Sequence, residues 1–356
     1  MKRFALLLLL LAFAATDASA QLKFTDATEL TLVNKLCPTE NPYHRVDTGN
    51  YNLTKNEAAL LRMPAGMALV FKTNSTRIAI RTEYLNYSTT RSSTTLVSQT
   101  GYDLYIRKDG EWLYAASNAP KDKDTVLQLI QDMDDSEKEC LVYLPLFSEL
   151  GRIEIGTDEN ASIAPSENPF RHRIVIFGSS FTHGTSTGRP GMAYPLIMQR
   201  NTGLQFISLG VSGNSKLQQS FARIIGDTPC DAIVVDAFSN PNATMIRERF
   251  LPFIETIREA HPGVPIIFLQ TIYRERCNFD LKVRASETEK RAAAREMFGK
   301  AKKQFGDIYF VDVPDQTGTD HITSLDGTHP DDLGYWRWAH AIQPSIVRIL
   351  KKYGIR

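Results

Sequence analysis

One serine of this sequence lies where a nucleophile would be exposed. Residues Ile174-Val-Ile-Phe-Gly-Ser-Ser-Phe-Thr-His-Gly184 begin with four apolar residues, which are typical of a buried strand, and continue as a polar turn into a helix. Ser180 lies at that turn. The C-terminal edge of a parallel strand exposes such a side chain, and the N-terminus of the next helix points free backbone N–H groups at it. Ser180 is therefore the candidate nucleophile.

An aspartate and a histidine near the C-terminus have the spacing of a general base and its partner. Asp326 and His329 form an Asp-x-x-His pattern directly before a predicted C-terminal helix. One short loop can then place the carboxylate against the imidazole Nδ1–H, which leaves Nε2 free to accept a serine proton. Asp326 and His329 are the candidate partners of the nucleophile.

Two other glycine-rich motifs fit the Ser180 region less well. A phosphate-binding loop requires Gly-x-x-x-x-Gly-Lys, but five residues separate Gly178 from Gly184 and no lysine follows. The nucleophile elbow Gly-x-Ser-x-Gly fails because Thr182 occupies its last position. The remaining pattern, Gly-x-Ser-x-Thr-x-Gly, resembles the first block of the SGNH (GDSL-like) hydrolases, with Ser179 in place of the usual aspartate.

Three further blocks of that family follow in order. Gly210-Val-Ser-Gly-Asn214 resembles the second block, Asp236-Ala-Phe-Ser-Asn-Pro-Asn242 the third, and Leu325–Tyr335 the last. The resemblance implies an oxyanion hole made by the backbone N–H groups of Ser180 and Gly213 and by the Asn240 amide. Asn242 is the alternative donor, because the third block lacks the glycine and the final aspartate of the usual Gly-x-Asn-Asp. Gly213 could also be required only for the dihedral angles of its turn.

Alternating strands and helices after residue 172 would position these groups. Strands are expected at 173–177, 205–209, 232–236, 265–270 and 308–312, and helices at 192–202, 215–225, 244–260, 286–304 and 332–353. This alternation predicts a parallel five-stranded sheet covered by helices on both faces, with the candidate residues beyond the carboxyl ends of its strands. The resemblance implies the flavodoxin-like α/β/α form of this fold for residues 173–356.

The preceding residues, 21–157, have the pattern of a separate all-β domain. Apolar and alternating runs such as 67–73 and 77–84 are separated by turn residues, and they predict a β-sandwich with the jelly roll as the leading topology. Gly101-Tyr-Asp-Leu-Tyr105 resembles the GxDLY signature of a domain that precedes SGNH domains in secreted esterases. Residues 158–172 are polar and rich in turn formers, which predicts a linker.

The first twenty residues are predicted to be a signal peptide. Lys2-Arg3 precede the apolar run Phe4–Ala15, and Ala18-Ser-Ala20 supplies a cleavage site. The run is too short to span a bilayer. Cleavage lowers the formal charge from +1 to 0, so no basic field would attract nucleic acid or acidic membranes. We expect a periplasmic or secreted protein that binds no nucleic acid and does not insert into a membrane.

Four cysteines in an exported chain could form two disulfides. Pairing within each domain would join Cys37 to Cys140 and Cys230 to Cys277. Buried free thiols are equally expected, because a protein of this size does not need covalent cross-links.

The resemblance implies a secreted serine esterase that removes acetyl groups from oligo- or polysaccharides, since relatives with this domain pair are similar to carbohydrate esterases. The polar segment Thr271–Ala285 favours a hydroxylated ligand over a long acyl chain. Phe181, Phe238 and Leu325 could instead build a deeper acyl groove. No cofactor or metal is implied, because the sequence has no His-x-x-x-His pair, close cysteine pair or acidic calcium loop.

One histidine and one group of aromatic residues near these blocks are more simply explained by packing than by function. His183 lies one helical turn from Ser180, and mere proximity is favoured over a catalytic role. Tyr335, Trp336 and Trp338 could offer a sugar platform, but core packing is favoured because they lie inside the terminal helix.

Two other functions remain open at this level. The first is a lipid ester or thioester hydrolase of the same fold, which would usually carry an apolar lid or interfacial helix. The second is a non-catalytic protein whose β-domain binds carbohydrate and whose α/β domain is only a scaffold. Activity on acetyl esters and its dependence on chain length would separate these possibilities.

Overall fold

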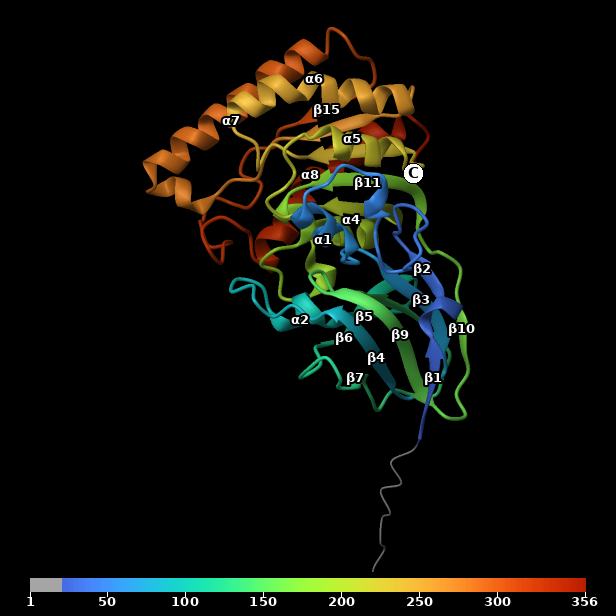
Figure 1. The fold of residues 1–356 in the computed structure, drawn as a ribbon. Coiled ribbons are helices and arrows are strands. Elements are labelled where there is room, and N and C mark those ends of the chain that lie inside the picture. Colours follow the sequence, from blue (N-terminus) through green and yellow to red (C-terminus); the bar gives the residue numbers. More distant parts are fainter. Residues whose placement is uncertain (1–20) are drawn as a thin grey trace, which may run out of the picture.

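The chain folds into two parts that follow one another along the sequence (Figure 1). The computed structural model describes residues 21–356, and the predicted signal peptide lies outside the described residues. The N-terminal part holds two antiparallel sheets, and the C-terminal part holds one parallel sheet with helices around it. These arrangements confirm the fold class that the sequence predicts.

The N-terminal part is a jelly roll. One sheet has the order β1-β9-β4-β7 and the other β10-β3-β8-β5-β6, with β2 also pairing with β3. The eight strands other than β2 and β10 are paired as in a double Greek key. The strands are β1 (Leu22–Asp26), β2 (Thr31–Val33), β3 (Ala68–Thr73), β4 (Ile78–Asn86), β5 (Tyr102–Lys108), β6 (Glu111–Asn118), β7 (Leu127–Ile130), β8 (Lys138–Tyr143), β9 (Glu149–Asp158) and β10 (Ile163–Pro165). Two helices, α1 (Lys55–Arg62) and α2 (Leu96–Thr100), lie in its connections.

The C-terminal part is a flavodoxin-like α/β/α domain. Its sheet order is β12-β11-β13-β14-β15 and every pairing is parallel, so the second strand in sequence lies at the edge beside the first. The strands are β11 (Arg171–Gly178), β12 (Leu204–Gly210), β13 (Ala232–Asp236), β14 (Ile266–Leu269) and β15 (Ile308–Val311). The helices are α3 (Ser180–His183), α4 (Tyr194–Thr202), α5 (Gln219–Gly226), α6 (Ala243–Ala260), α7 (Leu281–Ala301) and α8 (Asp332–Lys351).

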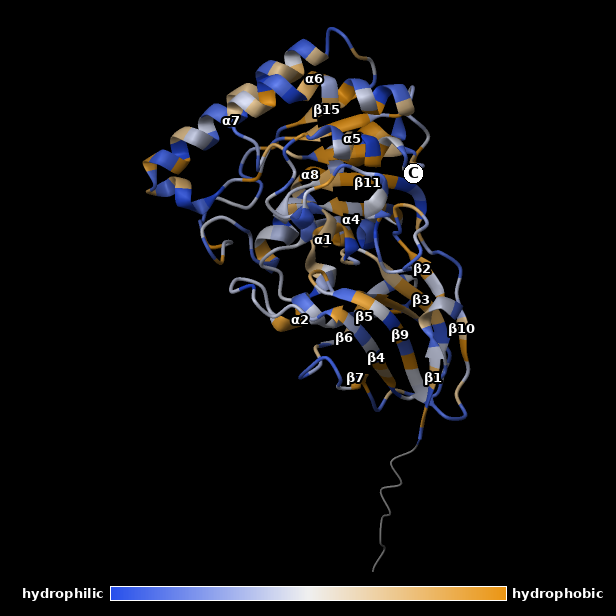
Figure 2. Cartoon of the chain, viewed as in Figure 1, coloured by the Kyte–Doolittle hydropathy of each residue, from blue (hydrophilic) through white to orange (hydrophobic). Residues whose placement is uncertain are grey.

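Helices cover both faces of the parallel sheet. Phe177 and Phe268 share one apolar cluster with residues of α5, α6 and α7, whereas Ile176 and Leu269 share another with residues of α4 and α8. Figure 2 shows hydrophobic residues concentrated along the strands of this sheet, while α6 and α7 mix hydrophobic and hydrophilic positions. A strand buried on both faces reads as a continuous apolar run, which is why β11 and β13 are recognisable in the sequence.

The two parts share a core. Alternate residues of β3 point in opposite directions: Leu69 and Phe71 join the core of the jelly roll, whereas Ala68 and Val70 join the apolar cluster that contains Phe177. Arg45, which is fully buried, also crosses this seam. Its guanidinium donates to carbonyl oxygens of Leu60 and Met63 in the N-terminal part and of Ser208 and Gly210 at the end of β12. Burial lowers the pKa of Arg45 to about 9.

The aspartate of the GxDLY motif forms a second contact across the seam. Asp103 is fully buried at the start of β5 and accepts hydrogen bonds from Arg189 Nη1, at 3.0 and 2.7 Å, and from the Gly191 N–H, at 2.8 Å. Burial raises the pKa of Asp103, although its two donors act in the opposite direction. The segment it holds, 184–191, leads from α3 to α4. The motif therefore ties the jelly roll to the chain that follows Ser180.

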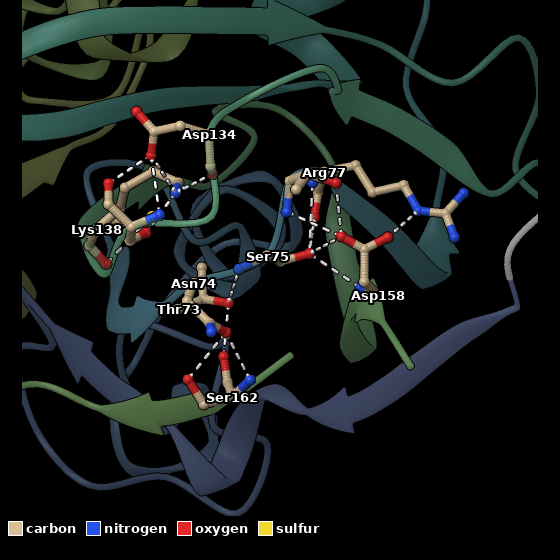
Figure 3. Close-up of polar contacts among 11 residues, drawn as sticks. Thr73, Asn74, Ser75, Arg77, Asp134, Lys138, Asp158 and Ser162 are labelled. Carbon is tan, nitrogen blue, oxygen red and sulfur yellow. Dashed lines mark hydrogen bonds and ion pairs between the residues drawn. The ribbon is translucent and has the colours of Figure 1, made fainter. Parts of the chain in front are cut away.

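Residues 158–172, predicted to be a linker, lie in part against the jelly roll (Figure 3). Asp158 accepts hydrogen bonds from Ser75 Oγ, from the Thr76 N–H and hydroxyl, and from Arg77 Nε, at 2.7–2.9 Å. The Ser162 N–H donates to Asn74 Oδ1, and β10 then pairs with β3. The turn at Asn74-Ser75 thus fastens the first half of this segment, and β11 begins at Arg171.

The structure also bears on the cysteines, on membrane spans and on metal sites. All four cysteines are free, so neither of the two possible disulfides forms. Among residues 21–356, no helix has the length and apolar character needed to cross a bilayer. The same residues contain no group of three or more His, Cys, Asp or Glu side chains that could hold a metal ion.

Asp103→Ala is expected to destabilise the protein by about 3–5 kcal/mol, because it leaves Arg189 and the Gly191 N–H without their buried acceptor. Urea unfolding followed by circular dichroism measures the change. Asp103→Asn keeps the shape and one acceptor, so it should cost less. An Asp103→Ala protein with the wild-type urea midpoint would show that this contact contributes no stability.

Candidate active site

Ser180 is the first residue of α3, immediately beyond β11. Ser179 caps the helix, since its hydroxyl accepts a hydrogen bond from the Phe181 N–H at 3.2 Å. A Cβ atom at Gly178 would lie 1.9 Å from the Thr182 hydroxyl oxygen, so only glycine fits before this turn. Gly184, with φ +95°, ends the helix. The pattern Gly-x-Ser-x-Thr-x-Gly is therefore a packing requirement of one tight turn.

Ser180, His329 and Asp326 form one hydrogen-bonded series. Ser180 Oγ lies 2.8 Å from His329 Nε2, and His329 Nδ1 lies 2.8 Å from Asp326 Oδ2. The second oxygen of Asp326 accepts from the backbone N–H groups of Thr328 and His329, at 2.9 and 2.7 Å. Burial alone would raise the pKa of Asp326, but the hydrogen bonds from His329 and Thr328 outweigh it and hold that pKa below its usual value. Asp326 is thus kept as a carboxylate against the imidazole.

The loop that carries His329 is held at several points. The Ser324 hydroxyl donates to the His329 carbonyl oxygen at 2.8 Å, and Ser324 forms an antiparallel bridge with Pro330. The Arg276 N–H donates to the Gly327 carbonyl oxygen at 2.8 Å, which connects this loop to the segment after β14. The imidazole is therefore placed by the backbone around it as well as by Asp326.

The two asparagines of the third block have different hydrogen-bonding roles. Asn242 Oδ1 accepts from the Met245 N–H at 2.8 Å and caps α6. Asn240 Oδ1 accepts from the N–H and hydroxyl of Ser215, at 3.3 and 3.1 Å. A backbone N–H requires an acceptor, so this contact assigns the oxygen and leaves the Asn240 Nδ2 donor directed elsewhere. Both asparagines therefore accept through Oδ1, and the difference is that Asn242 is occupied as the cap of α6 whereas Asn240 is bound to the turn of the second block.

Gly213 lies in the turn after β12 with φ +75°, and a Cβ atom placed on it would meet nothing within 4 Å. The turn conformation alone accounts for glycine here, which is the simpler of the two interpretations made from the sequence. Gly213 is exposed, and the turn ends at Ser215, the residue that holds Asn240. The structure thus brings the second and third blocks together beside β11.

The buried carboxyl group of Asp236 binds the turn that carries Ser180. Asp236, at the end of β13, accepts hydrogen bonds through Oδ2 from the hydroxyls of Thr182, at 3.2 Å, and Tyr194, at 2.9 Å. Its Oδ1 has no hydrogen-bond partner among the described residues. Burial raises the pKa of Asp236 to about 7, against the opposing effect of the two hydroxyls. The role of Asp236 is not predicted from the sequence, where the only signal for it is the threonine four residues after Gly178.

Several residues near the candidate site are packed away from it. His183 is buried, its ring stacks on Phe147, and its Nε2 lies 2.7 Å from the Leu146 carbonyl oxygen. Its side chain therefore lies near Ser180 in sequence but makes no hydrogen bond to Ser180, His329 or Asp326. Phe181 and Phe238 are fully buried and line no open acyl groove, whereas Leu325 is exposed.

Within the aromatic cluster of α8, Tyr335 and Trp338 are core residues, as favoured from the sequence. Trp336 is an exception, because it is exposed and packs against His340.

The fold and these contacts define the class of protein: a flavodoxin-like α/β/α domain of the SGNH-hydrolase type. Residues 171–347 match the GDSL-like lipase/acylhydrolase family, and residues 22–163 match the GxDLY domain described as the N-terminus of SGNH-hydrolase-type esterases. A Bacteroides ovatus protein named as a GDSL-like lipase is 39% identical, with a TM-score of 0.91 over 93% of this chain and 98% of its own. The chain belongs to the GDSL-like lipase/acylhydrolase family.

More distant solved structures share the fold alone. A salicylyl-acyltransferase from a tetracycline biosynthetic pathway is 19% identical, with a TM-score of 0.72 over 94% of this chain and 99% of its own. A family two carbohydrate esterase from Cellvibrio japonicus is 12% identical, with a TM-score of 0.61 over 93% of this chain and 98% of its own. A comparison with curated proteins found no match.

Asn240→Ala is expected to lower kcat for ester hydrolysis by about 10²–10³ with little change in KM, because an oxyanion donor acts mainly in the transition state. Asn242→Ala should leave kcat near wild type and cost about 1 kcal/mol of stability through the lost helix cap. Steady-state kinetics and thermal unfolding of both variants measure this. A larger loss of kcat in Asn242→Ala would mean that the third block is misaligned by two residues.

The raised pKa of Asp236 predicts a pH-dependent stability. The folded state holds the proton up to about pH 7, whereas an aspartate in the unfolded chain loses it near 3.8. Stability is therefore fully present below pH 3.8 and falls as pH rises to about 7. Asp236→Asn lacks this titration, so its melting temperature should rise relative to wild type between pH 5 and pH 8, by about 2–4 °C per kcal/mol. A difference in melting temperature that stays constant from pH 5 to pH 8 would contradict the prediction.

Proposed function

We propose that this protein is a secreted serine esterase that removes acetyl groups from carbohydrates, with Ser180 as nucleophile. The observation that carries the proposal is the series from Ser180 Oγ through His329 to Asp326, with both heavy-atom distances at 2.8 Å. Such a series lets the imidazole take the serine proton while the carboxylate stabilises the resulting imidazolium. Family membership supports acyl-ester chemistry at this position.

In the proposed reaction, Ser180 Oγ attacks the ester carbonyl carbon as His329 Nε2 takes its proton. The Ser180 and Gly213 N–H groups and the Asn240 amide then donate to the oxyanion of the tetrahedral intermediate. His329 returns the proton to the leaving alcohol, and an acetyl-serine remains. Water attacks this ester with His329 again as base, which releases acetate and restores Ser180.

Two features support a carbohydrate as the alcohol. The Cellvibrio neighbour is a carbohydrate esterase, and another neighbour of similar fold, from Butyrivibrio proteoclasticus, is an acetyl xylan esterase. A hollow of about 630 Å³ lies beside the second block, where both parts of the chain meet. Its lining combines amide and hydroxyl groups with three charged side chains, and it includes Asn50, Tyr51, Asn52, Asn214, Gln218, Gln219, Glu57, Lys216 and Arg223. Amide and hydroxyl groups of this kind suit a polyhydroxylated ligand.

A second candidate, hydrolysis of esters with larger apolar acyl groups, is favoured by exposed apolar residues near His329. The polar composition of Thr271–Ala285 suggested a hydrophilic surface, but many of its charges pair locally: Arg276 with Asp280, and Arg284 with backbone carbonyl oxygens of Cys277 and Asn278. Phe279 is left 94% exposed. Leu281, Ile322 and Leu325 are also exposed on this segment and on the loop that holds His329.

The proposed location is outside the cytoplasm. It rests on the predicted signal peptide and on the substrate, because acetylated polysaccharides are extracellular polymers. Fractionation of cells that express the full-length chain tests it.

The turnover of p-nitrophenyl esters should fall steeply beyond acyl chains of about four carbons, with no activation by a lipid interface. Each further methylene gains roughly 0.8 kcal/mol only where an apolar surface receives it, and Phe181 and Phe238 are too buried to provide one. Rates on acetyl, butyryl and octanoyl esters measure this. Equal or faster turnover of octanoyl would favour the second candidate and contradict the acetyl-ester proposal.

The same assay with Ser180→Ala tests the mechanism. The substitution should abolish hydrolysis and leave the melting temperature nearly unchanged, because Ser180 Oγ bonds only to His329 among the described residues. Release of acetate from a panel of acetylated glycans, with Ser180→Ala as the blank, then tests the substrate class. Activity retained in Ser180→Ala would assign the nucleophile to another residue.

A further inference from the structure

Two cations converge on one backbone carbonyl oxygen beside the candidate oxyanion donor. Lys290 Nζ, from α7, donates to the Ser239 carbonyl oxygen at 3.0 Å, and Arg274 Nη2, from the segment after β14, donates to the same oxygen at 2.9 Å. Arg274 also donates to the Ser239 hydroxyl at 2.9 Å. Ser239 is buried and directly precedes Asn240. This peptide group therefore carries two charge-assisted hydrogen bonds on one acceptor.

These cations belong to a buried ionic cluster. Glu287 lies three residues before Lys290 on the same face of α7, contacts its ammonium directly, and lies 3.4 Å from Arg274 Nη1. The side chains of Lys290 and Glu287 are only 7% and 9% exposed. Burial lowers the pKa of Lys290, and the nearby Arg274 lowers it further, while Glu287 acts in the opposite direction. Lys290 and Glu287 are buried and Arg274 is partly buried. Burying charges is costly, so a cluster of this kind is weak evidence of stability and invites a functional explanation.

The carbonyl oxygen that the cluster holds is one of three anchors around Asn240. The second is Ser215, which binds Asn240 Oδ1, and the third is Asn242, which caps α6. Pro241 lies between them and restricts φ. A donor in an oxyanion hole must lie within about 2.7–3.1 Å of the developing charge, and such placement needs supporting contacts. The third block here lacks the glycine and aspartate usual in the family.

We propose that Lys290 and Arg274 are positioning residues that hold the Ser239–Asn240 peptide, so that the Asn240 amide faces the oxyanion. Neither side chain contacts the reacting atoms. The inference rests on the proposed function, because it concerns the donor of that reaction. Glu287 serves to keep both cations in place and to balance their charge.

The kinetic test is a double-mutant cycle between Lys290→Met and Asn240→Ala on p-nitrophenyl acetate. Lys290→Met should lower kcat by about 10- to 100-fold, as expected for a misplaced catalytic group, with KM nearly unchanged. In the Asn240→Ala background it should cause less than about a threefold further loss, because the group it positions is gone. Lys300→Met, on the exposed face of the same helix, is the matched control and should not change kcat.

A second variant distinguishes a loss of positioning from a folding defect. Arg274→Met removes the other cation and should show the same dependence on Asn240, and every variant is assayed well below its melting temperature. Equal losses of kcat in the wild-type and Asn240→Ala backgrounds would overturn the proposal, because Lys290 would then act independently of Asn240. An unchanged kcat in both Lys290→Met and Arg274→Met would overturn it as well.

A readout that needs no substrate separates this proposal from the proposed function. With selective ¹⁵N labelling of asparagine, the side-chain amide signal of Asn240 can be assigned from its absence in Asn240→Ala. It should shift and exchange faster with solvent in Lys290→Met but not in Lys300→Met. An unchanged signal would overturn the positioning role even if the esterase is active. A changed signal in a chain without Ser180-dependent hydrolysis would retain the positioning contact and reject the function.

Discussion

The hydrogen bond between Ser180 Oγ and His329 Nε2 joins two side chains that are 149 residues apart in sequence. It can form only because β11 ends beside β12 and β13, and because the loop before α8 returns to the same edge of the sheet. In a parallel sheet all carboxyl ends meet at one edge, and polar residues placed directly after each strand converge there. The remaining contacts of the site maintain this convergence.

The jelly roll takes part in holding that edge. Asp103 binds the segment 184–191 through Arg189 and Gly191, and residues of α2 and the loop before it contact the same segment. Within this segment the Gly188 N–H donates to Asp332, three residues after His329. One stretch of chain therefore connects the helix of Ser180, the GxDLY domain and the loop of His329. An N-terminal domain attached only as an independent binding module would not require such buried contacts.

Composition and structure disagree on the segment after β14, and the reason is charge pairing. Six of the fifteen residues of this segment, Thr271–Ala285, are charged. Several of these side chains pair with one another or with backbone carbonyl oxygens, and Arg274 turns inward to Ser239. The apolar side chain of Phe279 is left at the surface. The number of charged residues does not reveal which of them form ion pairs or bind backbone carbonyl oxygens. The path of the loop decides which of these contacts form.

The sequence by itself determined the elements and the order of the functional groups. Continuous apolar runs identify β11 and β13, and the Asp-x-x-His spacing suffices to bring Asp326 against His329, because both depend on residues close in the chain. Tertiary structure decided the contacts between distant residues: Arg45 with the end of β12, Asp103 with Arg189, and Lys290 with Ser239. It also decided that Asn242 caps a helix while Asn240 binds Ser215 in the turn of the second block. Such pairings depend on how the helices and strands pack against one another, and the local sequence pattern does not encode that packing.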